Sequence, residues 1–448
     1  MRSTAKLAVV VGLGRSGLAA ARLLRGEGVE VIGTDSATSE MLSPAVAEMG
    51  IQVIAGGHAG VPFSDVDLIV VSPGVPPLPE IAAAEAAGVE VIGELELACR
   101  FIDAPIIAVG GTNGKSTVTT LTALMFANAG FRTFSGGNLG TPLSEAVGGN
   151  WERLVVEVSS FQLERVLLFK PKVSILLNVT EDHLDRYPSF LAYAEAKGNA
   201  FARQDGEDVA VIPYGDASCE EQARRGRGRC LTFGTVGDFT SSGRKVFELA
   251  TGKEYSLEGS RLHGGHNVSN AAASIAAARA LGVGESAICR AIEQFEPLGH
   301  RMAFVTEHAK VRYYDDSKGT NVGASVTALL GLVETRGVLI AGGREKFGSY
   351  EPLVAALRQK GRALVVIGEA ADTIAQAVAG VVPVEKANSM ADAVARAQRL
   401  AEAGDAVLLS PACASFDMFT SYAERGDRFV EAVHELTSGT DRVAEFAP

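Results

Sequence analysis

Short apolar runs that suit buried β-strands alternate with Ala- and Leu-rich helical stretches along almost the whole chain. The runs Leu7–Val11, Ile106–Val109 and Val338–Ala341 are each four or five residues long and rich in Val, Ile or Leu. Runs of this length, each followed by a helical pattern, are typical of parallel strands joined by crossover helices. The pattern therefore predicts an α/β protein whose sheets are largely parallel.

Breaks in this pattern divide the chain into three predicted domains. We expect a Rossmann-like domain over residues 1–93, a central P-loop ATPase-type domain of mostly parallel sheet over residues 94–298, and a Rossmann-like α/β domain over residues 299–448. Three domains also suit the chain length, because a domain usually holds roughly 150 residues. The polar, turn-rich stretch 234–260 predicts hairpins inserted late in the central domain.

Nothing along the chain predicts insertion into a membrane. The apolar run at residues 7–11 is short and breaks at Gly12 before a helical pattern begins, which favours a strand over a secretory leader. No later run reaches the roughly 18 apolar residues that a spanning helix needs. We therefore expect no membrane insertion.

Composition and charge narrow the class of partner. Apolar residues make up 47% and charged residues 21% of the chain, as is typical of a folded protein with a sizeable core. The net charge of −12 argues against broad nucleic-acid binding and against an anionic membrane surface. The five cysteines are scattered and form no Cys-x-x-Cys pair, so they predict neither a zinc site nor a disulfide framework. We expect a cytoplasmic protein that acts on small molecules.

A glycine-rich turn follows the first predicted strand. Gly12, Gly14 and Gly17 have the spacing of a dinucleotide-binding turn, and the helical pattern 18–24 begins directly after them. Asp35 ends the next predicted strand, where such folds place an acidic partner for a ribose. The helix N-terminus would offer free N–H groups to a diphosphate. The motif leaves three alternatives open: a turn without ligand, an NAD site, and a site for a UDP-sugar diphosphate.

A second glycine-rich loop joins the strand 106–109 to a helical pattern over residues 116–129. Backbone N–H groups of such a loop and the positive end of the following helix surround phosphates. Lys115 would reach the β- and γ-phosphates of ATP, and the Ser116 hydroxyl would bind Mg²⁺. The loop is shorter than the general P-loop pattern, because Val109 stands where the first glycine of that pattern would lie. A glycine turn without ligand is the alternative, but it would leave Lys-Ser-Thr at a helix start unexplained. The loop reads Gly111-Thr112-Asn113-Gly114-Lys115-Ser116-Thr117.

This loop resembles the ATP loop of the Mur ligases, which add amino acids to the UDP-linked peptidoglycan precursor; folylpolyglutamate synthases carry a related loop. The resemblance extends from Gly12 to Phe419. Within the family, the chain is most similar to the branch that adds D-glutamate. It implies a monomeric, ATP-dependent amide ligase that acts on UDP-N-acetylmuramoyl-L-alanine in the cytoplasmic synthesis of peptidoglycan precursors. Further motifs that carry the resemblance are Leu154–Glu164, Asn178–Tyr187, His266–Ala272, Asp315–Asn321 and Ser410–Phe419.

The resemblance implies two Mg²⁺ sites, for which Mn²⁺ could substitute, with Ser116, Glu157, His183 and Lys197 as ligands. Glu157, read alone, is as well explained by a solvent-facing strand position, but an acid at a strand end beside a P-loop is an expected Mg²⁺ partner. His183 follows a predicted strand in a polar loop, where α/β sites assemble. Lys197 matches a lysine that the family carbamylates with CO₂, although the residues alone show only a helical lysine. Gly198 follows it where relatives often have bulkier residues.

The remaining site residues are likewise implied by resemblance. Those expected to act in catalysis are Lys115, His183, Lys197 and Arg301. Those expected to bind ATP are the loop residues 111–117, Asn270, Arg301, Asp316 and Lys318. Those expected to bind the UDP precursor are Arg15, Ser16, Asp35, Ser36, Ser72, Pro73, Gly74, Asn138, Ser159, Gln162 and His183. Those expected to bind D-glutamate are Thr320, Lys346, Ser415, Phe416 and Tyr422, the last often phenylalanine in relatives.

Three rival hypotheses remain at this point. A sister ligase for another amino acid would need a different third-domain pocket, and the folate branch lacks the first domain. An NAD-dependent oxidoreductase would explain Gly12–Gly17 and Asp35 but would leave Lys115, Glu157 and His183 without a role. A non-catalytic ATP-driven switch would not account for an acceptor pocket. Cys413 is interpreted as a packing residue, because no base is implied beside it.

Overall fold

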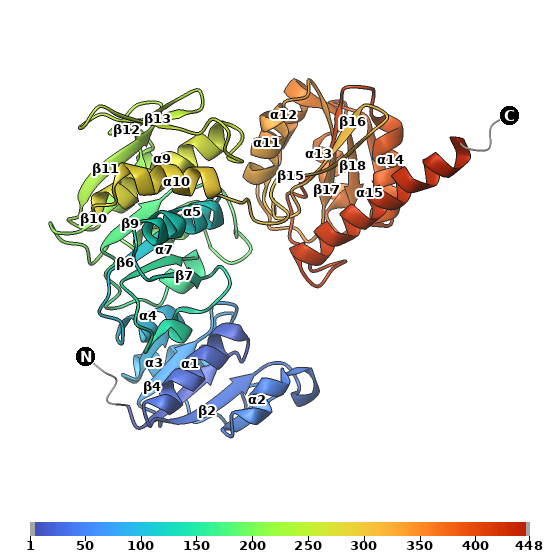
Figure 1. Ribbon diagram of the computed structural model, residues 1–448. Coiled ribbons are helices and arrows are strands. Elements are labelled where there is room, and N and C mark those ends of the chain that lie inside the picture. The colour runs from blue at the N-terminus through green and yellow to red at the C-terminus, as the bar shows by residue number, and fades with distance from the viewer. Residues whose placement is uncertain (1–4, 445–448) are drawn as a thin grey trace. The chain divides into compact units, whose positions relative to one another are not determined.

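The computed structural model describes residues 5–444, with side chains described as far as residue 438. Residues 1–4 and 445–448, which the predicted first and third domains include, lie outside this part. The described residues form three sheets, each inside one of the predicted segments (Figure 1). Their contacts group them into two compact units. The first holds the residues up to Val179 with Ala194–Ser260 and Val268–Phe295, and the second holds Thr180–Tyr193, Arg261–Asn267 and the residues from Glu296 on.

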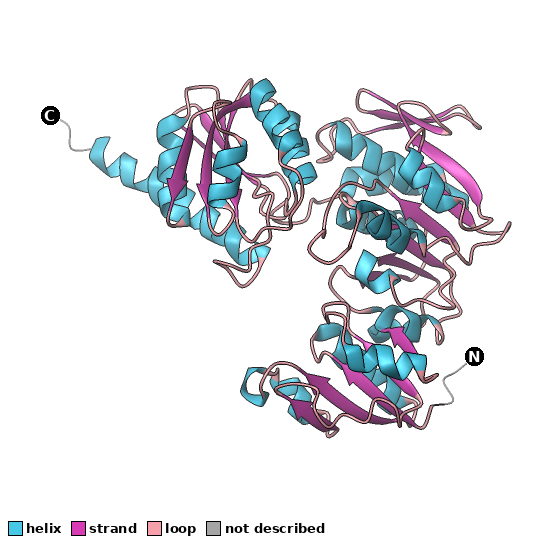
Figure 2. Ribbon diagram, turned by 180° about the vertical axis from the view of Figure 1, so that it is seen from behind, coloured by secondary structure: helices cyan, strands magenta, loops and turns pink. Residues whose placement is uncertain are grey.

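The first sheet consists of parallel strands. They are β1 (Leu7–Val11), β2 (Glu30–Asp35), β3 (Gln52–Ala55), β4 (Leu68–Val71) and β5 (Glu90–Gly93), with the helices α1 (Arg15–Gly26), α2 (Pro44–Glu48) and α3 (Pro79–Ala86) and the 3₁₀ turn η1 (Ser39–Met41). The strand order β3-β2-β1-β4-β5 is that of doubly wound nucleotide-binding folds. Apolar side chains of α1 and α2 pack on one face and those of α3 on the other. Figure 2 shows helices beside this sheet at the N-terminal end of the chain. The Rossmann-like prediction is confirmed.

The second sheet places the phosphate-loop strand β6 between β9 and β8. Its strands are β6 (Ile106–Gly110), β7 (Thr133–Gly137), β8 (Arg153–Glu157), β9 (Val173–Leu176), β10 (Val209–Pro213), β11 (Arg229–Gly234), β12 (Phe239–Ser242), β13 (Lys245–Glu248) and β14 (Lys253–Ser256). Its helices are α4 (Glu94–Cys99), α5 (Lys115–Asn128), α6 (Ser160–Leu163), α7 (Phe190–Gly198), α8 (Ala217–Ala223), α9 (Gly265–Ala280) and α10 (Glu285–Gln294), with the 3₁₀ turn η2 (Leu143–Ala146). The order is β14-β13-β12-β11-β10-β9-β6-β8-β7, and only the pairs of β12, β13 and β14 are antiparallel, which gives the predicted hairpins.

The third sheet has the order β15-β16-β20-β17-β18-β19 and is parallel except for the edge strand β15. Its strands are β15 (Ala303–His308), β16 (Val311–Asp315), β17 (Gly337–Gly342), β18 (Gly361–Ile367), β19 (Val384–Ala387) and β20 (Ala406–Leu409). Its helices are α11 (Val322–Gly331), α12 (Glu351–Lys360), α13 (Ala371–Ala377), α14 (Met390–Leu400) and α15 (Tyr422–Ala444). Apolar residues of α14 and α15 pack on one face, and those of α11, α12 and α13 on the other.

Strand register brings the predicted motifs to the carboxyl edges of the sheets. In the second sheet Val109 pairs with Glu157, so the phosphate loop and the Glu157 carboxylate leave adjacent strand ends. In the third sheet Asp315 and Ile340 both pair with Leu409, so three site segments start side by side. Binding sites of open parallel sheets lie at this edge.

Local chemistry in the sequence explains where several site helices begin. α5 starts after Gly114, whose φ of 86° is in the left-handed region that favours glycine. α6 has a capping box in which Ser159 and Gln162 bond each other's backbone N–H. α11 starts at the side chain of Asn321, which accepts the N–H of Ala324. The helical patterns predicted to start at residues 18 and 116 correspond to α1 and α5, which start at Arg15 and Lys115.

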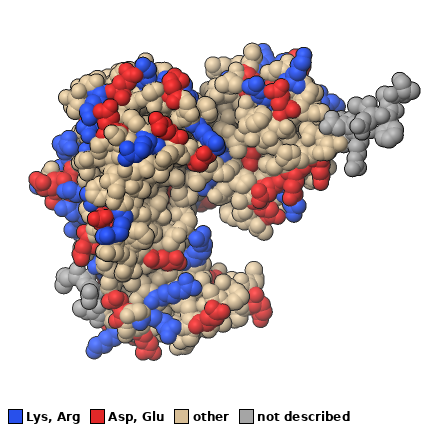
Figure 3. Space-filling model, in the orientation of Figure 1, with Lys and Arg blue, Asp and Glu red and all other residues tan. Residues whose placement is uncertain are grey.

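Acidic and basic side chains are interspersed on the face seen in Figure 3. The negative net charge is therefore not gathered into one patch on that face, and binding of anionic substrates depends on local geometry. Within residues 5–444, no helix is long and apolar enough to cross a membrane.

Candidate active site

The phosphate loop is shaped by contacts that only glycine permits. A Cβ added to Gly114 would lie 2.5 Å from Oδ1 of Asn270 on α9, so a side chain at this position would displace that asparagine. Asn178, directly after β9, accepts the N–H groups of Thr112 and Asn113 through Oδ1, at 3.1 and 2.9 Å. The loop is thus held from two neighbouring segments, and Asn270 and Asn178 both lie against it. Asn270 was expected there; Asn178 was not.

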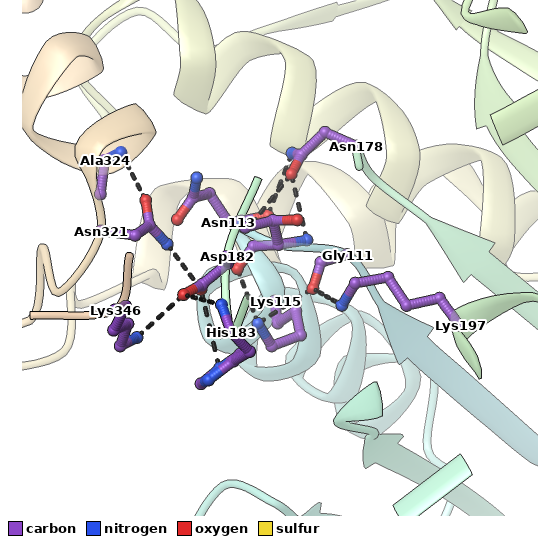
Figure 4. Close-up of polar contacts among 11 residues, drawn as sticks. Gly111, Asn113, Lys115, Asn178, Asp182, His183, Lys197, Asn321, Ala324 and Lys346 are labelled. Carbon is purple, nitrogen blue, oxygen red and sulfur yellow. Dashed lines mark hydrogen bonds and ion pairs between the residues drawn. The ribbon is translucent and has the colours of Figure 1, made fainter. Parts of the chain in front are cut away.

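Two lysines meet the first carbonyl of the loop (Figure 4). Lys115 Nζ donates to the carbonyl oxygens of Gly111 at 3.0 Å and Thr112 at 2.8 Å. Lys197, on α7, donates from Nζ to the Gly111 carbonyl at 2.8 Å and is only 3% exposed. The sequence alone could not distinguish this buried position from the solvated position that is usual for a helical lysine.

Glycine at position 198 has a steric reason. A Cβ at this position would lie 2.2 Å from Gln222 Oε1 and 2.7 Å from Arg225 Nη1. Arg225 also donates to the carbonyl of Glu195 and, at 2.7 Å, to Oδ1 of Asn199. Arg225 therefore occupies the space beside α7 that a side chain at position 198 would need, and it anchors the turn of α7 that carries Lys197.

Glu157 ends β8 as a buried carboxylate, 2% exposed. Its Oε1 accepts a hydrogen bond from Asn138 Nδ2 at 2.7 Å, while Oε2 is buried with no hydrogen-bond partner within the described residues. A buried carboxylate oxygen without a partner is costly unless a cation or donor satisfies it. The solvent-facing alternative for Glu157 is excluded by its burial. The carboxylate, together with the hydroxyl of the buried Ser116, fits a hard divalent cation such as Mg²⁺.

The first glycine turn is held by Asp35 and Ser72. Asp35 accepts the N–H of Leu13 at 2.7 Å and that of Ala37 at 2.9 Å, and Ser72 Oγ donates to the Gly12 carbonyl at 2.7 Å. A Cβ on Gly17 would lie 1.8 Å from the Gly12 carbonyl oxygen, which explains glycine at that position. Of the other predicted precursor contacts, Arg15, Ser16, Ser36, Pro73 and Gly74 lie near this turn in the sequence, while Ser159 and Gln162 bond each other in their capping box. Asn138 follows β7 of the second sheet and bonds Glu157, and His183 belongs to the second unit. Arg15, Ser36 and Asn138 are exposed, and Ser16 and Pro73 are partly so.

In the second unit, Asp182 forms an ion pair with Lys346, the lysine predicted to bind the acceptor. Lys346 Nζ lies 3.0 Å from Asp182 Oδ1, and Asn321 Nδ2 donates to Asp182 Oδ2 at 3.1 Å (Figure 4). The positive charges of Lys346 and His183, with these hydrogen bonds, hold the pKa of Asp182 below its usual range although burial raises it. His183 itself has a positive φ of 56°, and its backbone N–H donates to Asp182 Oδ1 at 2.9 Å. Asp182 thus orders both Lys346 and the His183 turn.

Asp316 is the most perturbed acid of the third domain. Burial raises its pKa to about 7, against a hydrogen bond from Ser410 Oγ at 2.7 Å and the positive charge of Arg301. The predicted acceptor residue Ser415 is buried, whereas the Phe416 side chain is 65% exposed and Thr320 is partly buried. Backbone hydrogen bonds of Arg344 with Ala414 place Lys346 and Ser415 on adjacent segments. The structure therefore brings the predicted acceptor residues to one end of the third sheet.

Arg425 lies among the predicted residues of the third domain, but sequence reasoning did not select it. It lies on α15, is 1% exposed, and donates to Ser317 Oγ at 3.0 Å, to the Ser317 carbonyl at 2.8 Å and to the Cys413 carbonyl at 3.1 Å. It thereby holds the segment before Lys318 against the segment before Ser415. Burial lowers the pKa of its guanidinium to about 10. An arginine in a polar helical stretch is usually solvated, so only the contacts in the structure identify the buried role of Arg425.

Cys413 fits the packing interpretation. Its side chain is fully buried among apolar residues, and its Sγ lies 3.6 Å from the Tyr350 hydroxyl. Burial raises the pKa of its thiol to about 11. Among the described residues no group of three or more His, Cys, Asp or Glu side chains is arranged to hold a metal. The predicted ligand set contains only Glu157 and His183 of those types.

Fold and site together define a nucleotide-using enzyme with a phosphate loop in its central sheet and doubly wound sheets before and after it. Three family profiles match in the same order: the N-terminal domain of MurD-like Mur ligases at residues 6–93, the Mur ligase middle domain at 109–278 and the Mur ligase glutamate ligase domain at 300–413. The chain belongs to the Mur ligase family.

Relatives within that family carry a more particular name. Proteins of Trichlorobacter lovleyi and Geobacter metallireducens, each named UDP-N-acetylmuramoylalanine–D-glutamate ligase, are similar to this chain. The first is 43% identical over 97% of this chain and 100% of its own length, and the second 42% identical over 98% and 99%. The solved UDP-N-acetylmuramate–alanine ligase of Thermotoga maritima shares the fold, with a TM-score of 0.59 at 20% identity over 96% of this chain and 99% of that one.

Proposed function

We propose that this protein is an ATP-dependent ligase that joins D-glutamate to UDP-N-acetylmuramoyl-L-alanine and releases ADP and phosphate. The observation that carries the proposal is the buried Glu157 carboxylate at the strand end beside the phosphate loop, with one oxygen unpartnered. This arrangement suits a cation held against phosphates and has no use in hydride transfer. The name of the relatives supplies the substrates. The product would serve peptidoglycan synthesis, and through it cell shape and division.

The reaction would proceed in two steps. The L-alanine carboxylate of the precursor attacks the γ-phosphorus of ATP, ADP leaves, and an acyl-phosphate forms. The amine of D-glutamate then attacks the acyl carbon, loses a proton, and expels phosphate to leave the amide. Lys115 and Arg301 would neutralise charge on the transferring phosphoryl oxygens. Because an acyl-phosphate hydrolyses in water, the site must exclude solvent before the first step.

Two Mg²⁺ ions would be held by Ser116, Glu157, His183 and a carbamylated Lys197, with Mn²⁺ as a substitute. When bound, these ions supply positive charge against the phosphate oxygens. Lys197 is suited to carbamylation by its burial against the Gly111 carbonyl of the phosphate loop, where an added carboxylate would help to hold a cation. We expect turnover to fall when CO₂ and bicarbonate are removed from the buffer and to return when they are restored. Unchanged turnover would overturn the carbamate.

Binding of the three substrates would be divided among the sheets. Residues 111–117, Asn270, Arg301, Asp316 and Lys318 would bind ATP. The edge of the first sheet, with Arg15, Ser16, Asp35, Ser36 and the turn 72–74, would bind the UDP end of the precursor, and Asn138, Ser159, Gln162 and His183 would contact it nearer the chemistry. Thr320, Lys346, Ser415, Phe416 and Tyr422 would bind D-glutamate, and a carboxylate of this acceptor would take the place at Lys346 that Asp182 now fills.

We further propose a monomer that acts in the cytoplasm. The five cysteines carry free thiols, as suits a reducing compartment, and the proposed roles need no residue from a second chain. Size-exclusion chromatography with light scattering, at the concentration used for turnover, tests the monomer.

Phosphate release tests the activity directly. Purified protein, ATP and Mg²⁺ are mixed with UDP-N-acetylmuramoyl-L-alanine and one amino acid at a time. We expect release with D-glutamate and not with L-glutamate, L-lysine or meso-diaminopimelate. Release with one of those three and not with D-glutamate would indicate a sister ligase, and no release with any acceptor would overturn the proposal.

A further inference from the structure

Lys318, which is expected to approach the phosphates of ATP, rests on the side chain of Tyr422. Its Nζ donates to the Tyr422 hydroxyl at 3.0 Å and lies 4.4 Å from the centre of the Tyr422 ring. One side chain therefore offers the ammonium both a hydrogen-bond acceptor and a π-face. Tyr422 was expected to matter only for the acceptor.

Both partners of this contact stand on backbone that is itself fixed. Ser317 Oγ donates to the Tyr422 carbonyl at 2.7 Å, and the Lys318 N–H donates to the His300 carbonyl at 3.1 Å. The buried Arg425, one turn further along α15, bonds both Ser317 Oγ and the Ser317 carbonyl. The Lys318 segment is thus attached to the first turn of α15 at several points. The Lys318 and Tyr422 side chains therefore project from backbone whose relative position is held by hydrogen bonds.

The Tyr422 ring also contacts His300. The His300 ring packs against it edge to face, with centroids 6.3 Å apart at 77°, and His300 Nδ1 is hydrogen-bonded to Asp315 Oδ2 at 2.6 Å. Asp315, His300, Tyr422 and Lys318 form one continuous chain of contacts from the end of β16. A lysine side chain is normally free to adopt many rotamers, and this arrangement restricts that freedom before the substrate arrives.

The chemistry of the partner leaves the lysine available for an anion. A phenol is neutral, and an ammonium has three donors, so the bond to Tyr422 leaves both the charge and further donors for phosphate oxygens. Lys346 contrasts with this, because its partner is the carboxylate of Asp182. Within the described residues no acidic side chain pairs with Lys318.

We propose that Tyr422 is a positioning residue for Lys318: its hydroxyl and ring hold the lysine ammonium in place for the phosphates of ATP. This proposal rests on the proposed function, because it assigns Lys318 to the phosphates. It also makes one residue serve both substrates, since the same Tyr422 is expected at the acceptor site. Precise placement of a charged group before reaction is worth more than its contact energy in the ground state.

The substitution Tyr422→Phe tests this, because it keeps the ring and removes only the hydroxyl. We expect kcat/KM for ATP to fall about five- to tenfold, with KM for the UDP precursor unchanged. Tyr314→Phe is the matched control, since it removes a tyrosine hydroxyl that bonds Glu334 at 2.9 Å in the same domain and away from Lys318. It should leave kcat/KM unchanged. A Tyr422→Phe enzyme with wild-type kcat/KM for ATP would overturn the proposal.

A double-mutant cycle separates positioning from a general structural role. In the Lys318→Met background, adding Tyr422→Phe should have no further effect, because the residue through which Tyr422 acts is gone. An equal loss in both backgrounds would overturn the proposal. If Lys318→Met has no turnover, the same cycle is measured as the dissociation constant of ATP, with the same two readings. Wild-type protein without D-glutamate-dependent phosphate release would overturn the proposed function instead, so the two failures are distinct.

Discussion

At the scale of single residues, the site depends on polar groups whose surroundings are set by burial. Asp316 is the clearest case, because burial holds its pKa near 7 while Ser410 and Arg301 pull it down. An aspartate in this state is partly protonated in the physiological range. Its charge therefore changes in the pH range where the enzyme works. As a proposed ATP-binding residue, Asp316 would then accept hydrogen bonds from the ribose of ATP more strongly when it is ionised.

ATP affinity should consequently rise with pH. Ribose hydroxyls donate more strongly to the ionised carboxylate, so the dissociation constant of ATP should fall up to about tenfold between pH 6 and pH 8. Asp316→Asn should remove this pH dependence of the dissociation constant, except for the part that comes from the phosphates of ATP. Titration calorimetry at several pH values measures it. A pH step of the same size in the variant would contradict the assignment to Asp316.

The same carboxyl group should affect folding stability with a predictable sign. Its folded pKa of about 7 lies above the unfolded value of about 3.9, so the folded state binds the proton more tightly. Stability from this group is complete below about pH 4 and is lost as the pH rises towards 7. The melting temperature of Asp316→Asn, relative to that of the wild type, should therefore rise from pH 5 to pH 8. A difference that stays constant over this pH range would contradict the predicted sign.

Residue types in motifs could be predicted from the sequence, but their environments could not. Lys115, Ser116 and Asn270 lie at the phosphate loop because the loop and the α9 motif are short-range patterns. The burial of Lys197 depends on α7 packing against a loop far away in sequence. The roles of Arg425 and Asp182 depend on contacts with segments more than a hundred residues distant in sequence. No local pattern encodes those contacts.

At the scale of elements, α4 joins the first sheet to the second through two buried glutamates that differ in their partners. Glu96 Oε2 accepts the N–H groups of Leu167, Leu168 and Phe169 at 2.8, 2.9 and 3.1 Å, and its Oε1 pairs with Arg100 at 3.0 Å. Glu94 Oε1 accepts one N–H, from Ser144 at 2.6 Å, while Oε2 has no hydrogen-bond partner among the described residues. Burial raises the pKa of Glu94 above its ordinary value.

These two glutamates give a matched pair of substitutions in one helix. Glu96→Gln should lower the free energy of unfolding by about 2–3 kcal/mol, because it removes the charge that three N–H groups and Arg100 share. Glu94→Gln should change it by less than about 1 kcal/mol, since the charge it removes is poorly solvated in the fold. Melting temperatures in the same buffer measure both. Equal losses would show that burial alone, and not the number of partners, decides the cost.

The sequence pattern predicted the strands and helices better than it predicted how one sheet is connected to the next. The strands and helices around the phosphate loop were expected within a few residues of where they lie, since period and composition are local. The hairpins of β12, β13 and β14 were also expected from turn residues. The role of α4 was not predicted, because a short helix with two glutamates is equally typical of a solvated surface.

At the scale of the whole molecule, a segment from within the predicted central domain belongs to the second unit. Thr180–Tyr193 groups with that unit, although its neighbours on both sides in the sequence belong to the first. The contacts of Asp182 with Lys346 and Asn321 account for part of this grouping. The unit that carries the predicted acceptor residues therefore also carries His183, while the phosphate loop, Glu157 and the edge of the first sheet lie in the other unit.

This division predicts that chemistry and precursor binding can be separated by one substitution. Lys115→Ala removes the charge at the phosphate loop and should abolish D-glutamate-dependent phosphate release, because nothing else in the loop supplies that charge to the γ-phosphate. The dissociation constant of UDP-N-acetylmuramoyl-L-alanine should stay within about twofold of the wild-type value, since the UDP end is assigned to the first sheet. Asp35→Ala is the complementary variant: loss of its bonds to Leu13 and Ala37 should weaken precursor binding while ATP still binds. Calorimetry with each ligand gives the four constants, and loss of precursor binding in Lys115→Ala would mean that the phosphate loop also shapes the precursor site.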